Sequence, residues 1–116
     1  MDIGSLVALC QAALAGTLKT VSELRSRRLS SHERDLLHAA AENGEFFLLS
    51  AGQIASTWVR AGGKDFIDTG DSADPAYAAH YMDAFRSLCE RGYVLHEGGQ
   101  LFVLTGEGFD RARSLG

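Results

Sequence analysis

The first apolar stripe of the chain lies in residues 3–28, where hydrophobic residues recur at helical spacing. Val7, Cys10, Leu14, Val21 and Leu24 fall on one line when this segment is drawn as a helix. The spacing approximates a heptad over about three repeats, which suits a helix that lies along a partner. Two partners fit: the rest of the same domain, or a second copy of the chain. We therefore expect a long N-terminal helix within residues 1–29 that serves packing or dimerisation.

A second helix is predicted to begin after Ser30. Ser30 and Glu33 have the spacing of a capping box, in which each side chain accepts a hydrogen bond from the other residue's backbone. An apolar face follows, and Gly44 can adopt the left-handed conformation that ends a helix. The next residues, EFFLLS, are apolar and favour extended backbone, so we predict a short strand over residues 45–50.

Residues 50–62 are compatible with two structures. Ser50 and Gln53 have the spacing to cap a short helix that would end at Arg60. The stretches TWV at 57–59 and FI at 66–67 instead favour two strands, with AGGK as the turn between them. We favour the hairpin, and the helix stays the alternative.

A third helix and a second hairpin are predicted in the last part of the chain. Asp74 is a good N-cap, Pro75 suits the first helical turn, and the helix is expected to end at Arg91. The segments YVLHE and QLFVLT then pair across a Gly-Gly turn, and Thr105 caps a last short helix. The residues expected on the inward side of the third helix are Ala78, Tyr81, Met82, Phe85, Leu88 and Cys89.

The order of these elements resembles that of a winged helix-turn-helix domain, and of small C-terminal winged-helix-like modules in bacterial multi-domain proteins. The pattern ALxxLxxxGYVxxxxxxxFxLTxxG, which ends many such domains, is matched by Ala84, Leu88, Gly92, Tyr93, Val94, Phe102, Leu104, Thr105 and Gly108, with Phe85 in place of its first Leu. The resemblance implies an α+β fold with a winged-helix-like domain over residues 30–116, in which the C-terminal β-hairpin is the wing and a short helix follows. Residues 50–74 depart from the family, where a tight turn joins the two helices.

Charge is distributed unevenly along the chain and bears on DNA binding. Residues 1–34 hold five basic and three acidic residues, a net charge of +2, whereas residues 35–116 hold six basic and twelve acidic residues, a net charge of −6. In a winged helix the helix at 75–91 would enter the major groove and the hairpin would contact the backbone. That helix presents Asp83, Arg86 and Glu90 outward, so that with Asp74 the acids slightly outnumber the bases, and the hairpin tip carries Glu97 without a basic residue. This face is a poor one for phosphate.

The basic residues lie mainly before the predicted domain. Candidate nucleic-acid contacts are Arg25, Arg27, Arg28, Arg34 and Arg86. A salt-bridged helix end would explain most of them equally well, because cations near a helix C-terminus interact favourably with its dipole. A DNA-binding transcriptional regulator that uses the winged helix and the basic segment 19–34 is therefore the alternative function.

No motif in the sequence indicates catalysis, a metal or a cofactor. The triplet DTG at 68–70 resembles the catalytic triplet of aspartic proteases, but Asp71 stands where a small residue is usual and the β-rich context is lacking. Cys10 and Cys89 do not have the spacing of zinc ligands. We expect both cysteines to be buried as small hydrophobic residues in a reducing cytosol. We expect no enzyme activity.

The first expectation for function is a protein-interaction or assembly module in a bacterial cytoplasmic protein. The N-terminal apolar stripe and the acidic side of the domain suit protein partners, and we expect a homodimer. Trp58, Tyr77 and Tyr93 are candidate anchors, although core packing is the ordinary role of such residues. The N-terminal apolar run is too short to span a bilayer and lacks the positive flank of a signal peptide, so we expect no membrane association.

Overall fold

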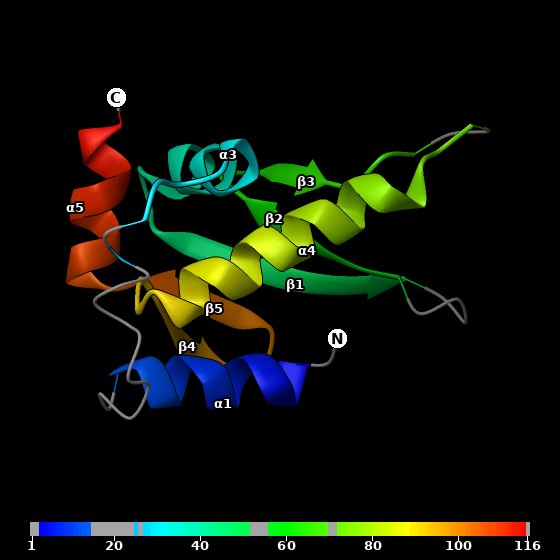
Figure 1. Cartoon of the computed structure of the whole chain (residues 1–116). Coiled ribbons are helices and arrows are strands. Elements are labelled where there is room, and N and C mark those ends of the chain that lie inside the picture. The colour runs from blue at the N-terminus through cyan, green and yellow to red at the C-terminus, as the bar shows by residue number, and fades with distance from the viewer. Residues whose placement is uncertain (1–2, 15–24, 26, 52–55, 70–71, 116) are drawn as a thin grey trace.

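The computed structural model describes residues 3–14, 25, 27–51, 56–69 and 72–115, and it has an α+β architecture (Figure 1). In chain order the elements are α1 (Ile3–Leu14), α3 (Ser31–Ala40), β1 (Glu45–Ala51), β2 (Ser56–Ala61), β3 (Lys64–Phe66), α4 (Pro75–Glu90), β4 (Val94–Gly98), β5 (Leu101–Leu104) and α5 (Gly106–Ser114). None of these helices has the length and apolar content needed to cross a membrane.

The strands form one five-stranded antiparallel sheet in the order β3-β2-β1-β5-β4. β1 lies at the centre, where Phe46 pairs with Ala61 of β2 on one side and with Phe102 of β5 on the other. The two outer pairs of strands are each a hairpin, β2 with β3 and β4 with β5. The strand predicted at residues 45–50 therefore joins two local hairpins into one sheet.

The hairpin predicted around AGGK is confirmed, and the alternative helix ending at Arg60 is wrong, because Ser56–Ala61 is strand β2. The turn uses Gly62 and Gly63, which both have positive φ angles, of 58° and 77°. A Cβ atom on Gly62 would lie 2.1 Å from the backbone oxygen of Ala39. The glycine is therefore required both by the turn and by its close approach to α3.

The three predicted helix starts are confirmed. The Ser30 hydroxyl accepts a hydrogen bond from the Glu33 amide, and the Glu33 carboxylate accepts one from the Ser30 amide, which completes the capping box. The Asp74 side chain accepts a bond from the amide of Ala76, next to Pro75 in the first turn of α4. Thr105 caps α5 through its hydroxyl. Local chemistry therefore sets each start.

One face of the sheet is covered by helices, and the hydrophobic core lies between them. α4 and α3 pack across this face, α1 packs on α4 and β4, and α5 packs on α3 and β5 (Figure 1). The six residues predicted to face inward from the third helix are all buried. The large sheet residues that they cover are Phe46, Leu48, Val59, Phe66, Val94 and Phe102, each at most 1% exposed.

The N-terminal helix is described over Ile3–Leu14 only, and this part packs within its own domain. Cys10 belongs to the domain core, Val7 is half-buried against it, and Leu14 is exposed. Val21 and Leu24 lie outside the described residues. Of the two partners that fit the predicted stripe, the chain's own domain is the one that the described turns contact. A role of the helix in dimerisation stays a prediction.

The connection between α3 and α4 differs from that of a helix-turn-helix. The two helices pack against each other, but β1, β2 and β3 lie between them in the chain. The hairpin expected as the wing is present as β4 and β5, and β5 pairs with the central strand β1. The fold is thus an α+β sheet with helices on one face.

Candidate interaction surface

The second face of the sheet carries the alternate residues of the same strands, because successive side chains in a strand point to opposite faces. In the strand register, Leu49 pairs with Trp58 of β2, and Phe47 pairs with Leu101 of β5. On the next strand, Leu95 pairs with Val103. Six neighbouring apolar side chains from four strands define what we call the open face: Phe47, Leu49, Trp58, Leu95, Leu101 and Val103.

The open face is accessible to solvent. Leu95 is 40% exposed and Phe47 is 36% exposed, and the other four side chains are half-buried by their neighbours in the sheet. The helices that contact the sheet bury the opposite set of residues, and in Figure 1 α1, α3 and α4 lie on the same side of the strands. Large contiguous apolar patches are uncommon on monomeric proteins and mark interaction sites.

An ion pair borders the open face at the β2–β3 hairpin. The Arg60 guanidinium donates to both carboxylate oxygens of Asp65, at 2.7 and 3.1 Å. The indole nitrogen of Trp58 donates to the same carboxylate at 3.1 Å. The hydrogen bond from Arg60, and then that from Trp58, hold the pKa of the Asp65 carboxyl below its usual value. The charge of Arg60 is thereby matched within the chain, and the orientation of the Trp58 ring is fixed.

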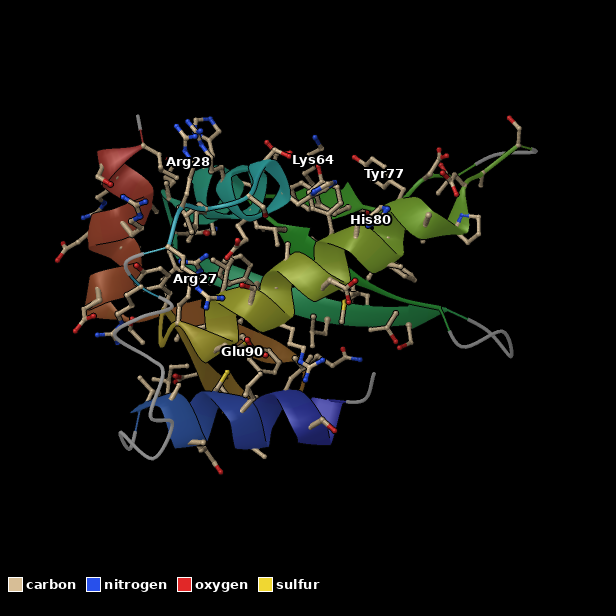
Figure 2. The ribbon with its side chains drawn as sticks, viewed as in Figure 1. Arg27, Arg28, Lys64, Tyr77, His80 and Glu90 are labelled. Carbon is tan, nitrogen blue, oxygen red and sulfur yellow. The ribbon has the colours of Figure 1, made fainter. Side chains whose placement is uncertain are left out.

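Of the three aromatic residues predicted as anchors, Trp58 is the one on the open face. Tyr93 is buried, with the Arg25 guanidinium over its ring at 5.9 Å. Tyr77 lies on α4, on the helical side of the molecule, and its ring contacts that of Tyr81 at 5.1 Å between centroids (Figure 2). Tyr93 therefore packs in the core, whereas Trp58 lies where it can contact a partner.

The five arginines predicted as nucleic-acid contacts are not brought into one patch. Arg25 forms an ion pair with Glu107 and donates to the backbone oxygen of Arg91 at 2.6 Å. Arg86 pairs with Glu90 on the same helix, at 3.3 Å. Arg27, Arg28 and Arg34 have exposed side chains, and those of Arg27 and Arg28 lie apart in Figure 2.

A buried ion pair joins the start of α3 to the end of α4. Arg91 donates to Glu33 at 2.8 Å, and each of the two residues is 4% exposed. The same guanidinium donates to the backbone oxygens of Arg27 and Arg28, at 2.9 and 3.4 Å. The pair therefore fastens the segment before α3 onto the domain. Sequence reasoning assigned Glu33 to the capping box alone, because no local pattern indicates a partner so far along the chain.

Histidine and tyrosine side chains cluster where α3 meets α4. The rings of His32 and His80 lie 5.5 Å apart, and the hydroxyl of Tyr81 donates to Asp35 at 2.7 Å. Burial, and then the hydrogen bond to Asp35, raise the pKa of Tyr81 well above its usual value. Across the described parts of the chain, no group of three or more histidine, cysteine or acidic residues is arranged to hold a metal ion.

The loop that carries the DTG triplet is described in part. The Asp68 carboxylate accepts a hydrogen bond from the backbone amide of Asp74 at 2.8 Å, and Asp74 in turn caps α4. Gly70 and Asp71 lie outside the described residues. Asp68 thus serves the loop, and Asp74 has the cap role that the sequence predicted.

The two cysteines are both buried, as predicted, but the structure also brings them together. Cys10 of α1 and Cys89 of α4 lie close enough for each thiol to shift the pKa of the other. Their separation in the sequence gave no signal for this contact.

Comparisons of the chain with protein-family models, with curated proteins and with solved structures find no match. The function is therefore argued from the chemistry of these surfaces.

Proposed function

We propose that the chain is a protein-interaction module without enzyme activity, that its working surface is the open face, and that its partner is a second copy of the chain. The observation that carries this proposal is the open face itself, where Phe47 and Leu95 are exposed within a continuous apolar patch. Burial of apolar surface is the dominant favourable term in most protein association. Covering the open face with a partner would therefore lower the free energy of the system.

The charge pattern favours a partner of the same apolar character. Arg60 is the cation on the open side of β2, and Asp65 neutralises it within the chain. The face therefore presents no free basic group from its described strands that would select an acidic protein or a nucleic acid. In a two-fold dimer the same patch serves both copies, so an apolar face whose basic group is neutralised within the chain is complementary to itself, with Glu45 beside Val103 also on this face.

The area of the open face sets the expected affinity of the dimer. Strands lie about 4.8 Å apart and rise about 3.3 Å per residue, so four strands of about four to seven residues cover about 19 by 13–23 Å. This footprint of about 250–440 Å² is smaller than the roughly 600–1,000 Å² that each partner of a standard specific interface buries. We therefore expect a reversible dimer that depends on concentration, with two sheets packed face to face and the helices outside.

The proposal gives the β4–β5 hairpin a different use from that of a DNA-binding wing. The winged-helix-like assignment is supported by this hairpin and by its pairing with β1. The hairpin contributes Leu95, Leu101 and Val103 to the open face, whereas Glu97 lies at its tip. Apolar side chains on the strands and an acidic tip suit a protein contact better than phosphate.

Light scattering over a range of concentrations tests the proposal with two matched variants. Leu95 on the open face is 40% exposed, and Leu14 on α1 is 43% exposed. We expect Leu95→Glu to abolish the dimer, because the charge would be buried in the interface, and Leu14→Glu to leave it unchanged. Loss of the dimer in Leu14→Glu alone would assign self-association to the N-terminal stripe. A wild-type chain that stays monomeric at the highest concentration reached would contradict a second copy as the partner.

DNA binding is the alternative, and the exposed side chains of Arg27, Arg28 and Arg34 are the observation that favours it. The ion pairs of Arg25 and Arg86 weigh against it, because phosphate would have to compete with Glu107 and Glu90. Fluorescence anisotropy with mixed duplex DNA at low salt separates the two functions. Salt-sensitive binding that is lost when Arg27, Arg28 and Arg34 become alanine would favour the alternative.

A further inference from the structure

The thiols of Cys10 and Cys89 form a pair inside the seam between α1 and α4. Each residue is 0% exposed, and each thiol shifts the pKa of the other, which places the two side chains next to each other. Both residues belong to one core cluster, in which α1 packs directly on α4. The chain has two cysteines in all, so each of them is the other's one possible partner for a disulfide within the chain.

A groove of about 340 Å³ opens along the same seam, lined by Ser5, Leu6, Leu9 and Arg86. The two helices run in the same direction, as their colours show in Figure 1. Leu6 precedes Cys10 by four residues and Arg86 precedes Cys89 by three, so the groove lies about one helical turn from the thiols along both helices. A small molecule in the groove therefore lies about one helical turn from the thiol pair.

We propose that Cys10 and Cys89 are an oxidation site, at which a peroxide converts the two thiols into a reversible disulfide that links α1 to α4. The inference does not depend on self-association, because neither cysteine lies on the open face. The inference rests on two observations, the contact of the two thiols with each other and the groove beside them.

The contact also distinguishes the two sulfur atoms. The hydrogen bond from Cys89 lowers the pKa of the Cys10 thiol, whereas burial, and then the bond to Cys10, raise the pKa of the Cys89 thiol. Since the thiolate is the nucleophile, the proposed sequence of steps begins at Cys10. Its sulfur attacks one peroxide oxygen and the O–O bond breaks, which gives a sulfenic acid and one water molecule.

Cys89 completes the reaction. Its sulfur attacks the sulfur of the Cys10 sulfenic acid, the S–S bond forms, and the hydroxyl group leaves with the Cys89 proton as a second water molecule. In total the two thiols lose two electrons and two protons, and one hydrogen peroxide is reduced to two waters. The disulfide closes a loop from residue 10 to residue 89 and fixes α1 on α4, which restricts the unfolded chain and stabilises the fold.

The experiment treats the full chain with hydrogen peroxide, alkylates the remaining thiols under denaturing conditions, and measures the intact mass. We expect the number of alkylated thiols to fall from two to none, with a mass lower by two hydrogen atoms than that of the reduced chain. The melting temperature should rise by more than about 5 °C. A dithiol reductant should reverse both changes.

Cys10→Ser and Cys89→Ser provide the controls, because each leaves a single thiol that has no partner within the chain. Neither variant should show the loss of two hydrogen atoms or the rise in melting temperature. The proposal is overturned if the wild-type chain keeps both thiols, forms only disulfides between chains, oxidises only to sulfinic acid, or melts at a lower temperature after treatment.

A third variant tests the groove as the route of access. Leu9→Trp places a larger side chain in the groove without changing either thiol, so we expect oxidation to be several-fold slower while the final product is the same. An unchanged rate would show that the oxidant reaches the thiols by another path, and would remove the groove from the proposal.

Discussion

The two faces of the sheet are built from neighbouring residues of the same strands but have different surroundings. In β1, Phe46 and Leu48 are fully buried under the helices, whereas Phe47 and Leu49 lie on the open face. An antiparallel sheet with one face in water normally alternates apolar and polar residues. Here the second face also carries six apolar side chains, next to Glu45 and the Arg60–Asp65 ion pair, so these strands are more apolar than those of a sheet with one face in water. This difference is the physical basis for expecting a partner on the open face.

The largest contrast is expected between Phe46→Ala and Phe47→Ala. Phe46 is 0% exposed and contacts the Phe85 ring at 5.2 Å between centroids, so its truncation leaves a cavity. We expect Phe46→Ala to lower the free energy of unfolding by about 3–5 kcal/mol. Phe47→Ala should cost less than about 1 kcal/mol in the monomer, since surface changes are usually small. Urea unfolding at low protein concentration measures both, and equal losses would show that the open face is packed within the chain.

The two ion pairs give a second contrast. Arg91 and Glu33 are paired inside the helical side, whereas Arg60 and Asp65 are paired on the open side. We expect Arg91→Ala to cost about 3–5 kcal/mol in the free energy of unfolding, because Glu33 would be left as a buried unpaired charge. The matched change Arg60→Ala should cost about 0–1 kcal/mol. Denaturant unfolding of both variants checks this order, and a reversal would contradict the burial of the Arg91 pair.

A smaller effect is expected from the pKa of Tyr81 on the covered face. Its folded-state pKa is raised, so Tyr81 stays neutral in the folded chain while the unfolded chain ionises near its usual value of about 10. Its contribution to stability is full below about pH 10 and is lost as the pH rises towards the folded-state pKa. We expect Tyr81→Phe to flatten the fall of stability above that pH, as followed by urea unfolding at several alkaline pH values. An identical pH dependence in both proteins would contradict the raised pKa.

The sequence was sufficient for features that depend on nearby residues. The caps at Ser30, Asp74 and Thr105 and both hairpin turns follow from side chains within a few positions of each other. The joining of the two hairpins through β1 was not foreseen, because it depends on pairing between distant segments. The Glu33–Arg91 ion pair was missed for the same reason.

The sequence contains one indication of the open face. The run EFFLLS was predicted only as a short strand, yet its four consecutive apolar residues indicate a strand that is covered on both faces. The open face also needs the register between β1, β2 and β5, which places Trp58 and Leu101 beside the apolar residues of β1. Since register depends on the whole sheet, the face was not predictable from the strand alone.

The most direct test of a dimer through the open face is an isotope-filtered NOE experiment on a mixture of methyl-labelled and unlabelled chains. The account predicts contacts between the methyl groups of Leu49, Leu101 and Val103 of one copy and the rings of Phe47 and Trp58 of the other. Contacts between copies that are confined to Leu14 and the rest of α1, or an absence of contacts in a sample that light scattering shows to be dimeric, would contradict it.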